Sequence, residues 1–441
     1  MKKDTIFQLY EIFKKSPIAV TDSRKIVPNC VFFALKGENF DGNRFATEAI
    51  RLGAACSVVD DKTLLNSATP EVFVVENVLE TLQLLALFHR RQFGIPIIAI
   101  TGSNGKTTTK ELINSVLSTH YTTHSTAGNF NNHIGVPLTL LAMPPKTDIA
   151  VVEMGANHQK EIEFLCSLAE PTHGIVTNMG KAHLEGFGGE EGVRKGKSEL
   201  YKYLSENHGI GFINMSEPFL TEYSEILGRK RLFYTESDNL NIAHIPFEVQ
   251  KLSETPNLKV QFIDENQALI SAQSHLAGDY NFKNLMTAIV VGKYFKVPAA
   301  KIKQGIENYK PKNNRSQWID YQENKFFMDA YNANPTSMAA AVESFFRTDN
   351  SNKFLILGGM KELGEASFAE HQNLLQFVLQ RFQKNQIILV GSEFCDIART
   401  SNITYFDNVN LLKNWFQAEQ FKNQTFFLKG SRSIGLEKLI V

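Results

Sequence analysis

The sequence IIAITGSNGKTTTKELINSVL, residues 97–117, decides the fold class, because it joins an apolar strand, a glycine-rich loop and an amphipathic helix. The opening apolar run is typical of a buried strand. The helix is indicated by apolar side chains at helical spacing, namely Leu112, Ile113, Val116 and Leu117. A strand that turns through glycines into a helix presents backbone N–H groups and the positive helix end to an anion. The stretch therefore predicts an α/β protein with a phosphate-binding loop.

The loop is shorter than the common phosphate-binding pattern, because its two glycines enclose only Ser103 and Asn104. Lys106 can reach the terminal phosphates of a nucleotide, and Thr107 stands where a hydroxyl would ligate magnesium. The alternative is an ordinary Gly-Ser turn that caps a helix. We predict nucleotide binding by the following residues: Gly102, Ser103, Asn104, Gly105, Lys106, Thr107 and Thr108.

A carboxylate for the same metal is supplied by Glu153, which closes the apolar run of residues 149–153 just before Gly155. Magnesium beside a nucleotide needs a carboxylate at the tip of a neighbouring strand. A solvated loop residue or a helix cap is the alternative interpretation of Glu153. The combination with the glycine loop predicts a magnesium-dependent nucleotide site.

Length and composition place further bounds on the function. A chain of 441 residues is too long for one ordinary core, so we expect two to four domains. Lys+Arg and Asp+Glu are equal at 46 each without blocks of like charge, which argues against binding to nucleic acid or anionic lipid. No secretory signal is found, and no apolar run approaches the ~20 residues of a membrane span. We therefore expect a cytoplasmic protein whose four scattered cysteines are core thiols.

Strand and helix signals divide the chain into three blocks, which we expect to be domains of residues 1–93, 94–310 and 311–441. The second block has apolar runs between helices at 97–101, 149–153, 174–178 and 210–214, and the third has them at 353–359, 386–391 and 425–430. Continuous apolar strands that alternate with helices predict parallel sheets covered on both faces. The alternating run at 258–263 suggests a small antiparallel addition.

Several motifs, in this order, resemble the Mur ligase family, whose members build the peptide stem of bacterial cell-wall precursors. They are TGSNGKTTTKE, TAGNFNNHIGVPLTLL, VVEMGANH, TNMGKAHLEGFGG, GKSELY and DAYNANPTSM, and together they span most of the chain. Mur ligases use a shortened glycine loop of this kind. The resemblance implies a three-domain architecture, with a central parallel-sheet P-loop ATPase domain and a Rossmann-like C-terminal domain.

Within the family, YNANP (331–335) and GGMKELGE (358–365) resemble the members that add D-alanyl-D-alanine. The resemblance implies an ATP-dependent ligase that joins this dipeptide to UDP-N-acetylmuramoyl-tripeptide through an acyl phosphate, acting as a monomer. One alternative is a related amide ligase with a different amino substrate, including one that acts on folate. Others are a nucleotide-binding switch that transfers nothing, and a kinase. A switch has no need for His183 and Lys197, the two residues considered next.

The resemblance also implies a second magnesium ion, held by His183 and by Lys197 after carbamylation with CO₂. A lysine with a lowered pKa exposes a neutral amine to CO₂, and the carbamate is an anionic oxygen ligand. Without the resemblance, Lys197 would be interpreted as a solvated surface residue and His183 as a hydrogen-bonded loop histidine. Together with Lys106 and Glu153, they form the expected catalytic set.

At the nucleoside end, Asn281 and Asn284 match the paired asparagines of the family, although Tyr280 stands where relatives often have histidine. Arg315 resembles the family arginine at the nucleotide, and Asp329 ends a strand where it could meet the ribose or the phosphates. The alternatives are a helix-capping asparagine pair and a surface arginine. The presence of Tyr280 leaves the expected role of Asn281 unchanged, and it affects only the role expected of the side chain at position 280.

The remaining expectations concern the two other substrates. Ser23 and Arg24 resemble the anchor of the uridine diphosphate moiety, and arginine's fork suits phosphate oxygens. A plain turn with local caps is the alternative there. The precursor's peptide is expected near Asn131 and Asn132, and further substrate contacts come from two asparagines of the YNANP motif: Asn332 and Asn334. We expect the third block, with KGSR at residues 429–432, to close over ATP and the dipeptide.

Overall fold

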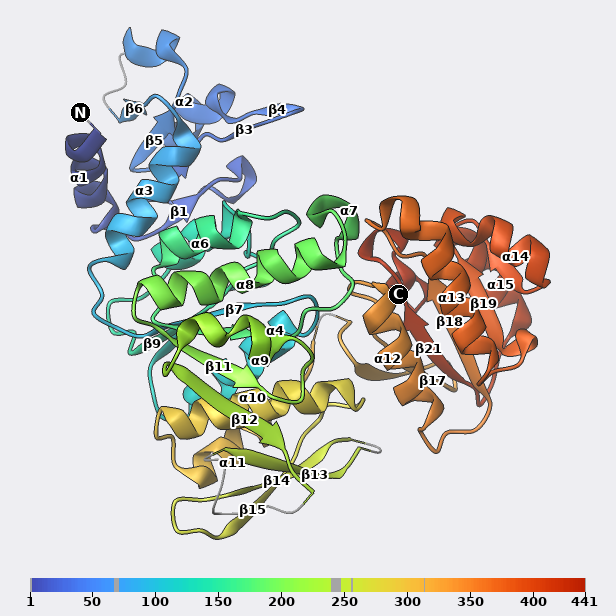
Figure 1. The fold of residues 1–441 in the computed structure, drawn as a ribbon. Coiled ribbons are helices and arrows are strands. Elements are labelled where there is room, and N and C mark those ends of the chain that lie inside the picture. The colour runs from blue at the N-terminus through green and yellow to red at the C-terminus, as the bar shows by residue number, and fades with distance from the viewer. Residues whose placement is uncertain (1, 67–70, 239–246, 255–256, 313, 441) are drawn as a thin grey trace.

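The computed structural model describes residues 2–66, 71–238, 247–254, 257–312 and 314–440. Within them the strands form three larger sheets and one two-stranded hairpin. The sheets follow one another along the chain, and Figure 1 shows the N-terminal part (blue) and the C-terminal part (orange to red) on different sides of the central part. The predicted α/β class with parallel sheets is confirmed. Within the described residues, no helix combines the length and apolar character that crossing a membrane requires.

The N-terminal part is built on a small parallel sheet of order β1-β2-β5-β6. Its strands are β1 (Ala19–Val20), β2 (Val31–Phe33), β5 (Cys56–Val59) and β6 (Val72–Val74), and the hairpin is β3 (Lys36–Gly37) with β4 (Phe40–Asp41). Its helices are α1 (Lys2–Phe13), α2 (Ala46–Arg51) and α3 (Val78–Arg90). Helix α3 begins at the side-chain cap of Asn77 and packs on both α1 and the central part.

The central part has a sheet of order β15-β14-β13-β12-β11-β10-β7-β9-β8, parallel from β13 to β8 and antiparallel from β13 to β15. The parallel strands are β7 (Ile97–Thr101), β8 (Thr123–Ser125), β9 (Ile149–Glu153), β10 (His173–Val176), β11 (Ile210–Asn214), β12 (Arg231–Glu236) and β13 (Glu248–Ser253). The antiparallel pair is β14 (Lys259–Ile263) and β15 (Leu269–Gln273), as the alternating run at 258–263 predicted.

Helices cover both faces of the central sheet, because the side chains of each strand alternate between two cores. On β7, Ile97 and Ala99 face a core shared with α5 (Gly135–Leu141), α6 (Glu161–Ala169) and α8 (Glu190–Glu206). Ile98 and Ile100 face the other core, with α4 (Lys106–Leu117), α10 (Tyr280–Tyr294) and α11 (Ala299–Asn308). The two short helices of this part are α7 (Leu184–Phe187) and α9 (Leu220–Tyr223). A strand buried on both faces explains the continuous apolar run at 97–100.

The C-terminal part is a sheet of order β16-β17-β21-β18-β19-β20 in which only the β16–β17 pair is antiparallel. Its strands are β16 (Gln317–Tyr321), β17 (Asn324–Met328), β18 (Lys353–Gly358), β19 (Ile387–Val390), β20 (Thr404–Phe406) and β21 (Thr425–Lys429). Its helices are α12 (Pro335–Phe346), α13 (Ser367–Leu379), α14 (Cys395–Ser401) and α15 (Val409–Glu419).

The sequence analysis did not identify the edge strands β8 and β20, nor the interior strands β12 and β13 of the central sheet. Strand β20 has three residues and β8 has three, and neither is fully buried. A short, half-buried strand carries little apolar periodicity, so its position is decided by the sheet it joins. The four cysteines are free thiols, with Cys30, Cys56 and Cys166 buried and Cys395 half-buried.

Candidate active site

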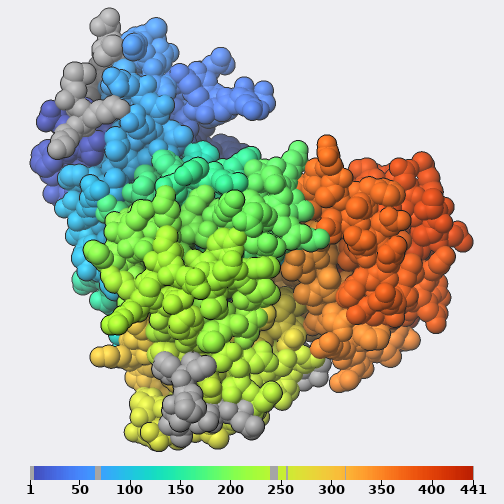
Figure 2. All heavy atoms as spheres, in the orientation of Figure 1, coloured from blue at the N-terminus to red at the C-terminus, as the bar shows by residue number. Residues whose placement is uncertain are grey.

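A cavity of about 1030 Å³ lies where the central and C-terminal parts meet, at the carboxyl ends of their parallel strands. Figure 2 shows these two parts, in green and orange, in contact with each other. This is the edge at which open α/β sheets bind ligands. Most of the residues predicted from the sequence line it: Ser103, Asn104, Gly105, Lys106, Thr107, Thr108, Asn131, Asn132, Glu153, His183, Asn281, Arg315, Asp329, Asn332 and Asn334. Four predicted residues are not part of this lining: Gly102, Lys197, Ser23 and Arg24.

The glycine loop runs from β7 into α4, as predicted, and both glycines are required by close packing. A Cβ on Gly102 would lie 2.0 Å from Oγ1 of Thr177, and one on Gly105 would lie 2.6 Å from Oδ1 of Asn284. Both also have positive φ angles, 135° and 80°. Any other residue at these positions would push the loop away from the neighbouring strand and helix.

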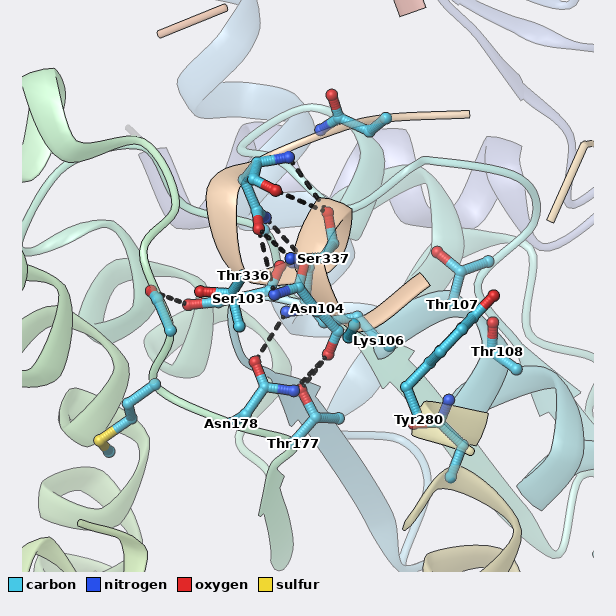
Figure 3. Close-up of a pocket in the computed structure, with 18 of the residues that line it drawn as sticks. Ser103, Asn104, Lys106, Thr107, Thr108, Thr177, Asn178, Tyr280, Thr336 and Ser337 are labelled. Carbon is cyan, nitrogen blue, oxygen red and sulfur yellow. Dashed lines mark hydrogen bonds between the residues drawn. The ribbon is translucent and has the colours of Figure 1, made fainter. Parts of the chain in front are cut away.

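Residues at the end of β10 hold the loop in place, and the sequence analysis assigned them no role. Thr177 donates from Oγ1 to the carbonyl of Asn104 at 2.6 Å, and Oδ1 of Asn178 accepts from the Asn104 N–H at 3.0 Å (Figure 3). Ser103 donates to the carbonyl of Gly180 at 2.8 Å. A signal was present, since polar residues that directly follow a buried strand at this sheet edge are candidates for the site.

Lys106 curls back over its own loop. Its Nζ donates to the carbonyls of Gly102 at 2.6 Å and Ser103 at 3.2 Å. Burial lowers the pKa of the Lys106 ammonium, although the nearby Glu153 carboxylate acts in the opposite direction. The two hydrogen bonds therefore hold the Lys106 amino group beside the backbone of the glycine loop.

Glu153 is a buried carboxylate at the end of β9, only 1% exposed. Its Oε1 accepts from Thr107 Oγ1 at 3.1 Å and from Asn131 Nδ2 at 2.8 Å. Its Oε2 has no hydrogen-bond partner, which is unusual for a buried carboxylate oxygen. The structure thus excludes the solvated-loop and helix-cap alternatives for Glu153, and it brings together the predicted hydroxyl and carboxylate.

Lys197 lies on α8 and is fully buried, so the surface-lysine alternative is wrong. Its Nζ donates to the carbonyl of Ala156 at 3.1 Å and lies 4.8 Å from the centre of the Phe187 ring. Burial, together with the positive charge of Lys106, holds the pKa of Lys197 well below its ordinary value. The cavity is lined by Ala156, so Lys197 lies behind its wall.

His183 contacts the C-terminal part directly. Its backbone has a φ of 52°, and its Nδ1 lies against the carboxylate of Glu362. The contact with His183 lowers the pKa of Glu362, although its geometry is not that of a hydrogen bond. Because Nδ1 is engaged in this way, Nε2 is the ring nitrogen left for another partner. The partner Glu362 comes from the GGMKELGE motif, whose contact with His183 the sequence did not reveal.

The paired asparagines of α10 form a hydrogen-bonded chain and do not cap the helix, whose N-cap residue is Asp279. Asn284 donates to Asn281 at 3.0 Å and accepts from Thr109 at 3.0 Å. Asn281 donates to the carbonyl of Ala277 at 2.8 Å and to Oγ of Ser316 at 3.0 Å. The chain links α4, α10 and the start of the C-terminal part.

Tyr280 belongs to the same group of side chains. Its hydroxyl lies 2.8 Å from Oγ of Ser316, and burial raises its pKa well above the ordinary value. The phenol therefore stays neutral and serves as a hydrogen-bonding group. Tyr280 occupies the position at which the sequence departs from the common family pattern.

Asp329 follows β17 and has a partner for each oxygen. Its Oδ1 accepts from the Ser316 N–H at 3.2 Å, and its Oδ2 accepts from Lys429 at 2.6 Å. Arg315 is half-buried, with its guanidinium 3.6 Å from the centre of the Tyr331 ring. The Arg315 guanidinium is thus held against Tyr331 at the wall of the cavity.

Two asparagines of the YNANP motif differ in their surroundings. Asn334 caps α12 and donates from Nδ2 to Oδ1 of Asn104 at 2.7 Å, which joins the C-terminal part to the glycine loop. Asn332 is exposed, and its carbonyl accepts from Lys429 at 3.3 Å. In the Asn131–Asn132 pair, Asn132 accepts from the Gly135 N–H at 2.9 Å at the start of α5.

Ser23 and Arg24 lie in a 3-10 helix, Ser23–Lys25, in the N-terminal part. Asp22 caps this helix, accepts from Arg24 and has its pKa lowered to about 2 by these hydrogen bonds. The Arg24 side chain is 86% exposed. Local caps are therefore present, and the guanidinium is open to solvent.

Family models match three segments of the chain. They are the Mur ligase family catalytic domain at residues 18–93, the Mur ligase middle domain at residues 100–292, and the Mur ligase glutamate ligase domain at residues 314–432. Together they account for more than half of the sequence.

Individual relatives match over nearly their whole length. The UDP-N-acetylmuramoyl-tripeptide--D-alanyl-D-alanine ligase of Bacillus subtilis is 36% identical, with 95% of this chain and 91% of the relative covered. The crystal structure of MurF from Acinetobacter baumannii has a TM-score of 0.83 at 30% identity, covering 96% of this chain and 92% of that one. The structure of MurF ligase from Thermotoga maritima in complex with ADP has a TM-score of 0.79 at 25% identity and covers 96% of each chain.

Proposed function

The chain belongs to the Mur ligase family, and on that premise we propose that it is an ATP-dependent ligase that joins D-alanyl-D-alanine to UDP-N-acetylmuramoyl-tripeptide. The relatives that carry this activity in their names match both the sequence and the three-part fold. One observation carries the proposal most directly. A single cavity gathers the glycine loop, the strand-end Glu153, and residues of the C-terminal part that include Arg315.

The proposed division of labour follows the three blocks. Residues 1–93 would hold the UDP end of the precursor, 94–310 would bind ATP, and 311–441 would close over ATP and the dipeptide. The contacts between the last two parts support the closure, notably Asn104 with Asn334 and His183 with Glu362. We also propose that the functional unit is a monomer, as the resemblance implied.

ATP is needed because a carboxylate is a poor electrophile. The precursor's terminal carboxylate attacks the γ-phosphorus of ATP, forming an acyl phosphate and releasing ADP. The amine of the dipeptide then attacks the acyl carbon, and phosphate leaves as the amide forms. Both partners in the first step are anionic, so the site needs fixed cations more than a strong base. Lys106, held beside the loop's N–H groups, is placed for that role.

The residues around Glu153 fit a magnesium ion. A buried carboxylate oxygen without a hydrogen-bond partner, next to the hydroxyl of Thr107, is a donor set suited to a hard cation. Among the described residues, no three His, Cys, Asp or Glu side chains gather as a metal site. Such sparse protein ligation is usual for magnesium, which takes further oxygens from phosphates. When bound, the ion would neutralise phosphate charge.

Lys197 and His183 would hold the second ion of the proposed pair. The lowered pKa of Lys197 favours its neutral amine, which would add to CO₂ to give a carbamate and one released proton. Burial protects such a carbamate from water, and its oxygens could extend past Ala156 toward the cavity. His183 lines that cavity with Nε2 not engaged by Glu362.

The nucleoside and precursor contacts complete the proposal. Asn281, Arg315 and Asp329 would meet the nucleotide, because they surround the cavity beside the glycine loop. Asn131 and Asn132 would line the path of the tripeptide. Ser23 and Arg24 would bind the uridine diphosphate, which suits an exposed guanidinium. Asn332 and Asn334 would act at the dipeptide side.

The proposal is tested by phosphate release from ATP and Mg²⁺ with UDP-N-acetylmuramoyl-tripeptide, with and without D-alanyl-D-alanine. The nucleotide product is followed by mass in the same samples. We expect release to require the dipeptide and the product to gain the dipeptide's mass less water. L-alanyl-L-alanine is the matched control. Release that ignores the dipeptide, with no gain in mass, would contradict the proposal.

A further inference from the structure

Lys110 is a buried cation beneath the proposed magnesium site, and the roles above make no use of it. It lies on α4, one turn after Lys106, and its side chain is 2% exposed. A lysine ammonium loses its hydration when buried, so it persists only where other groups accept its hydrogen bonds and balance its charge. Its surroundings therefore indicate what it does.

The ammonium group of Lys110 joins helix α4 to the loop of residues 126–134, which follows β8. Its Nζ donates to the carbonyl of Thr126 at 2.7 Å and to that of Gly128 at 3.4 Å. It also lies 3.8 Å from Oε2 of Glu153, the carboxylate oxygen without a hydrogen-bond partner. The same group thus meets the loop and the carboxylate.

The loop in turn contacts Glu153 at two points. Oγ1 of Thr126 accepts from the backbone N–H of Glu153 at 2.9 Å. Asn131, farther along the loop, donates to Oε1 of Glu153 at 2.8 Å. Thr126 is therefore bound through its carbonyl by Lys110 and through its hydroxyl by the Glu153 backbone, which closes a ring of contacts.

We propose that Lys110 is a positioning residue for ligation: its hydrogen bonds to the carbonyls of Thr126 and Gly128 fix the loop of residues 126–134, with Asn131, against Glu153. This inference rests on the proposed function, since the loop also carries Asn132 into the cavity. Groups that orient the ligands of a metal commonly change activity or metal affinity by about 10–100-fold when removed.

The kinetic test uses Lys110→Met, which removes the charge and the donors while keeping a similar length. We expect kcat to fall about 10–100-fold, as for other orienting groups. The KM for UDP-N-acetylmuramoyl-tripeptide should rise because Asn131 and Asn132 lose their fixed positions. The KM for ATP should change much less, since the glycine loop keeps its own contacts with Thr177 and Asn178. Lys110→Gln, which retains an N–H donor, should lie between Lys110→Met and the wild type.

Arg90→Met is the matched control, because Arg90 is another buried cation that donates to backbone carbonyls. It is 6% exposed and donates to Ala169 at 2.8 Å and Phe93 at 2.8 Å, outside the cavity lining. We expect it to lower stability without altering the kinetic constants of the folded enzyme. The same kinetic pattern in Arg90→Met would overturn the proposal, because the effect would then come from lost stability alone.

A second readout needs no catalysis. Amide hydrogen exchange of the substrate-free protein should become at least about tenfold faster across residues 126–134 in Lys110→Met and Lys110→Gln, with α11 unchanged. Unchanged exchange together with wild-type kinetic constants would overturn the role of Lys110. If the wild-type protein makes no amide, the proposed function fails, yet the exchange measurement still tests the link between α4 and the loop.

Discussion

Two carboxylates at strand ends face the same cavity from opposite parts of the molecule. Glu153 ends β9 in the central part, and Asp329 follows β17 in the C-terminal part. Asp329 has a donor for each oxygen, from Ser316 and Lys429. Glu153 has donors for Oε1 only, and Oε2 faces Lys110 at 3.8 Å without a hydrogen bond.

The difference separates two uses of the same chemical group. A carboxylate whose oxygens are both satisfied is neutralised in advance and serves to hold neighbouring backbone and cations in place. A buried carboxylate with an unpartnered oxygen is costly unless a cation completes it. We therefore propose that Glu153 binds a cation, whereas Asp329 meets the nucleotide as a carboxylate already paired with Lys429 and Ser316.

The largest effect is expected from Glu153→Gln. The amide keeps the shape but loses the negative charge, so it would hold the cation that stabilises the transferring phosphate much less well. We expect kcat to fall on the order of 10²–10³-fold, measured as phosphate release over a series of Mg²⁺ concentrations. A loss below about tenfold would place Glu153 with Asp329 as an orienting group.

The carbamate proposed on Lys197 would be a third anionic group in the site, formed with CO₂ and not supplied by an acidic residue. Lys197→Met should lower kcat on the order of 10²-fold, with partial recovery when a short carboxylic acid is added to supply the missing oxygens. In the wild type, ¹³C-labelled bicarbonate should give a carbamate signal that is absent from the variant. Full activity in Lys197→Met would show that no anion is needed there.

Removing Lys429, the partner of Asp329, should lower the free energy of unfolding more than it lowers kcat. In the Lys429–Asp329 pair the two side chains are 5% and 13% exposed, so Lys429→Met leaves a nearly buried charge unpaired. We expect a loss of about 3 kcal/mol in unfolding free energy and a fall in kcat of about tenfold or less, measured by urea unfolding and phosphate release. The double variant with Asp329→Asn should regain part of the stability. If it regains none, the Lys429–Asp329 pair is not the source of the loss.

The smallest effect is expected from breaking the hydrogen bond between the central part and the C-terminal part. Asn334→Ala removes the bond to Asn104 and also the cap of α12, whereas Asn104→Ala removes only the bond. The cap alone is worth about 1 kcal/mol, so Asn334→Ala should lower the melting temperature further than Asn104→Ala. Both should raise the KM for ATP by a few fold, because the glycine loop loses its link to the C-terminal part. Equal melting temperatures would show that the cap contributes nothing.

Local patterns were sufficient to predict the glycine loop and Glu153. Glycines after an apolar strand, and a carboxylate that ends the next apolar strand, reach the same sheet edge in any parallel arrangement. The motifs that indicated Lys197 and His183 were specific, but the residue pattern alone pointed to an exposed lysine. A run with four polar neighbours contains no information that one side chain will be buried by the helix's packing against the central sheet.

Other residues of the site could not be found from the sequence. Lys110 lies on the helix that the sequence predicted, yet its contacts with Thr126 and Gly128 depend on how a later loop returns to α4. Glu362 meets His183 across 179 positions of the chain, which only the docking of the C-terminal part decides. Asn178 had a local signal, because it follows a buried strand, and could have been assigned.

By itself, the sequence determined the α/β class, the anion-binding loop and the likeness to a ligase family, because these depend on periodicity, on glycine's freedom at positive φ and on side-chain chemistry at fixed spacing. The tertiary structure decided which carboxylate oxygen has no partner, which lysine is buried and which cation each carboxylate meets. Those properties depend on burial and on donors from distant segments, and no local pattern specifies either.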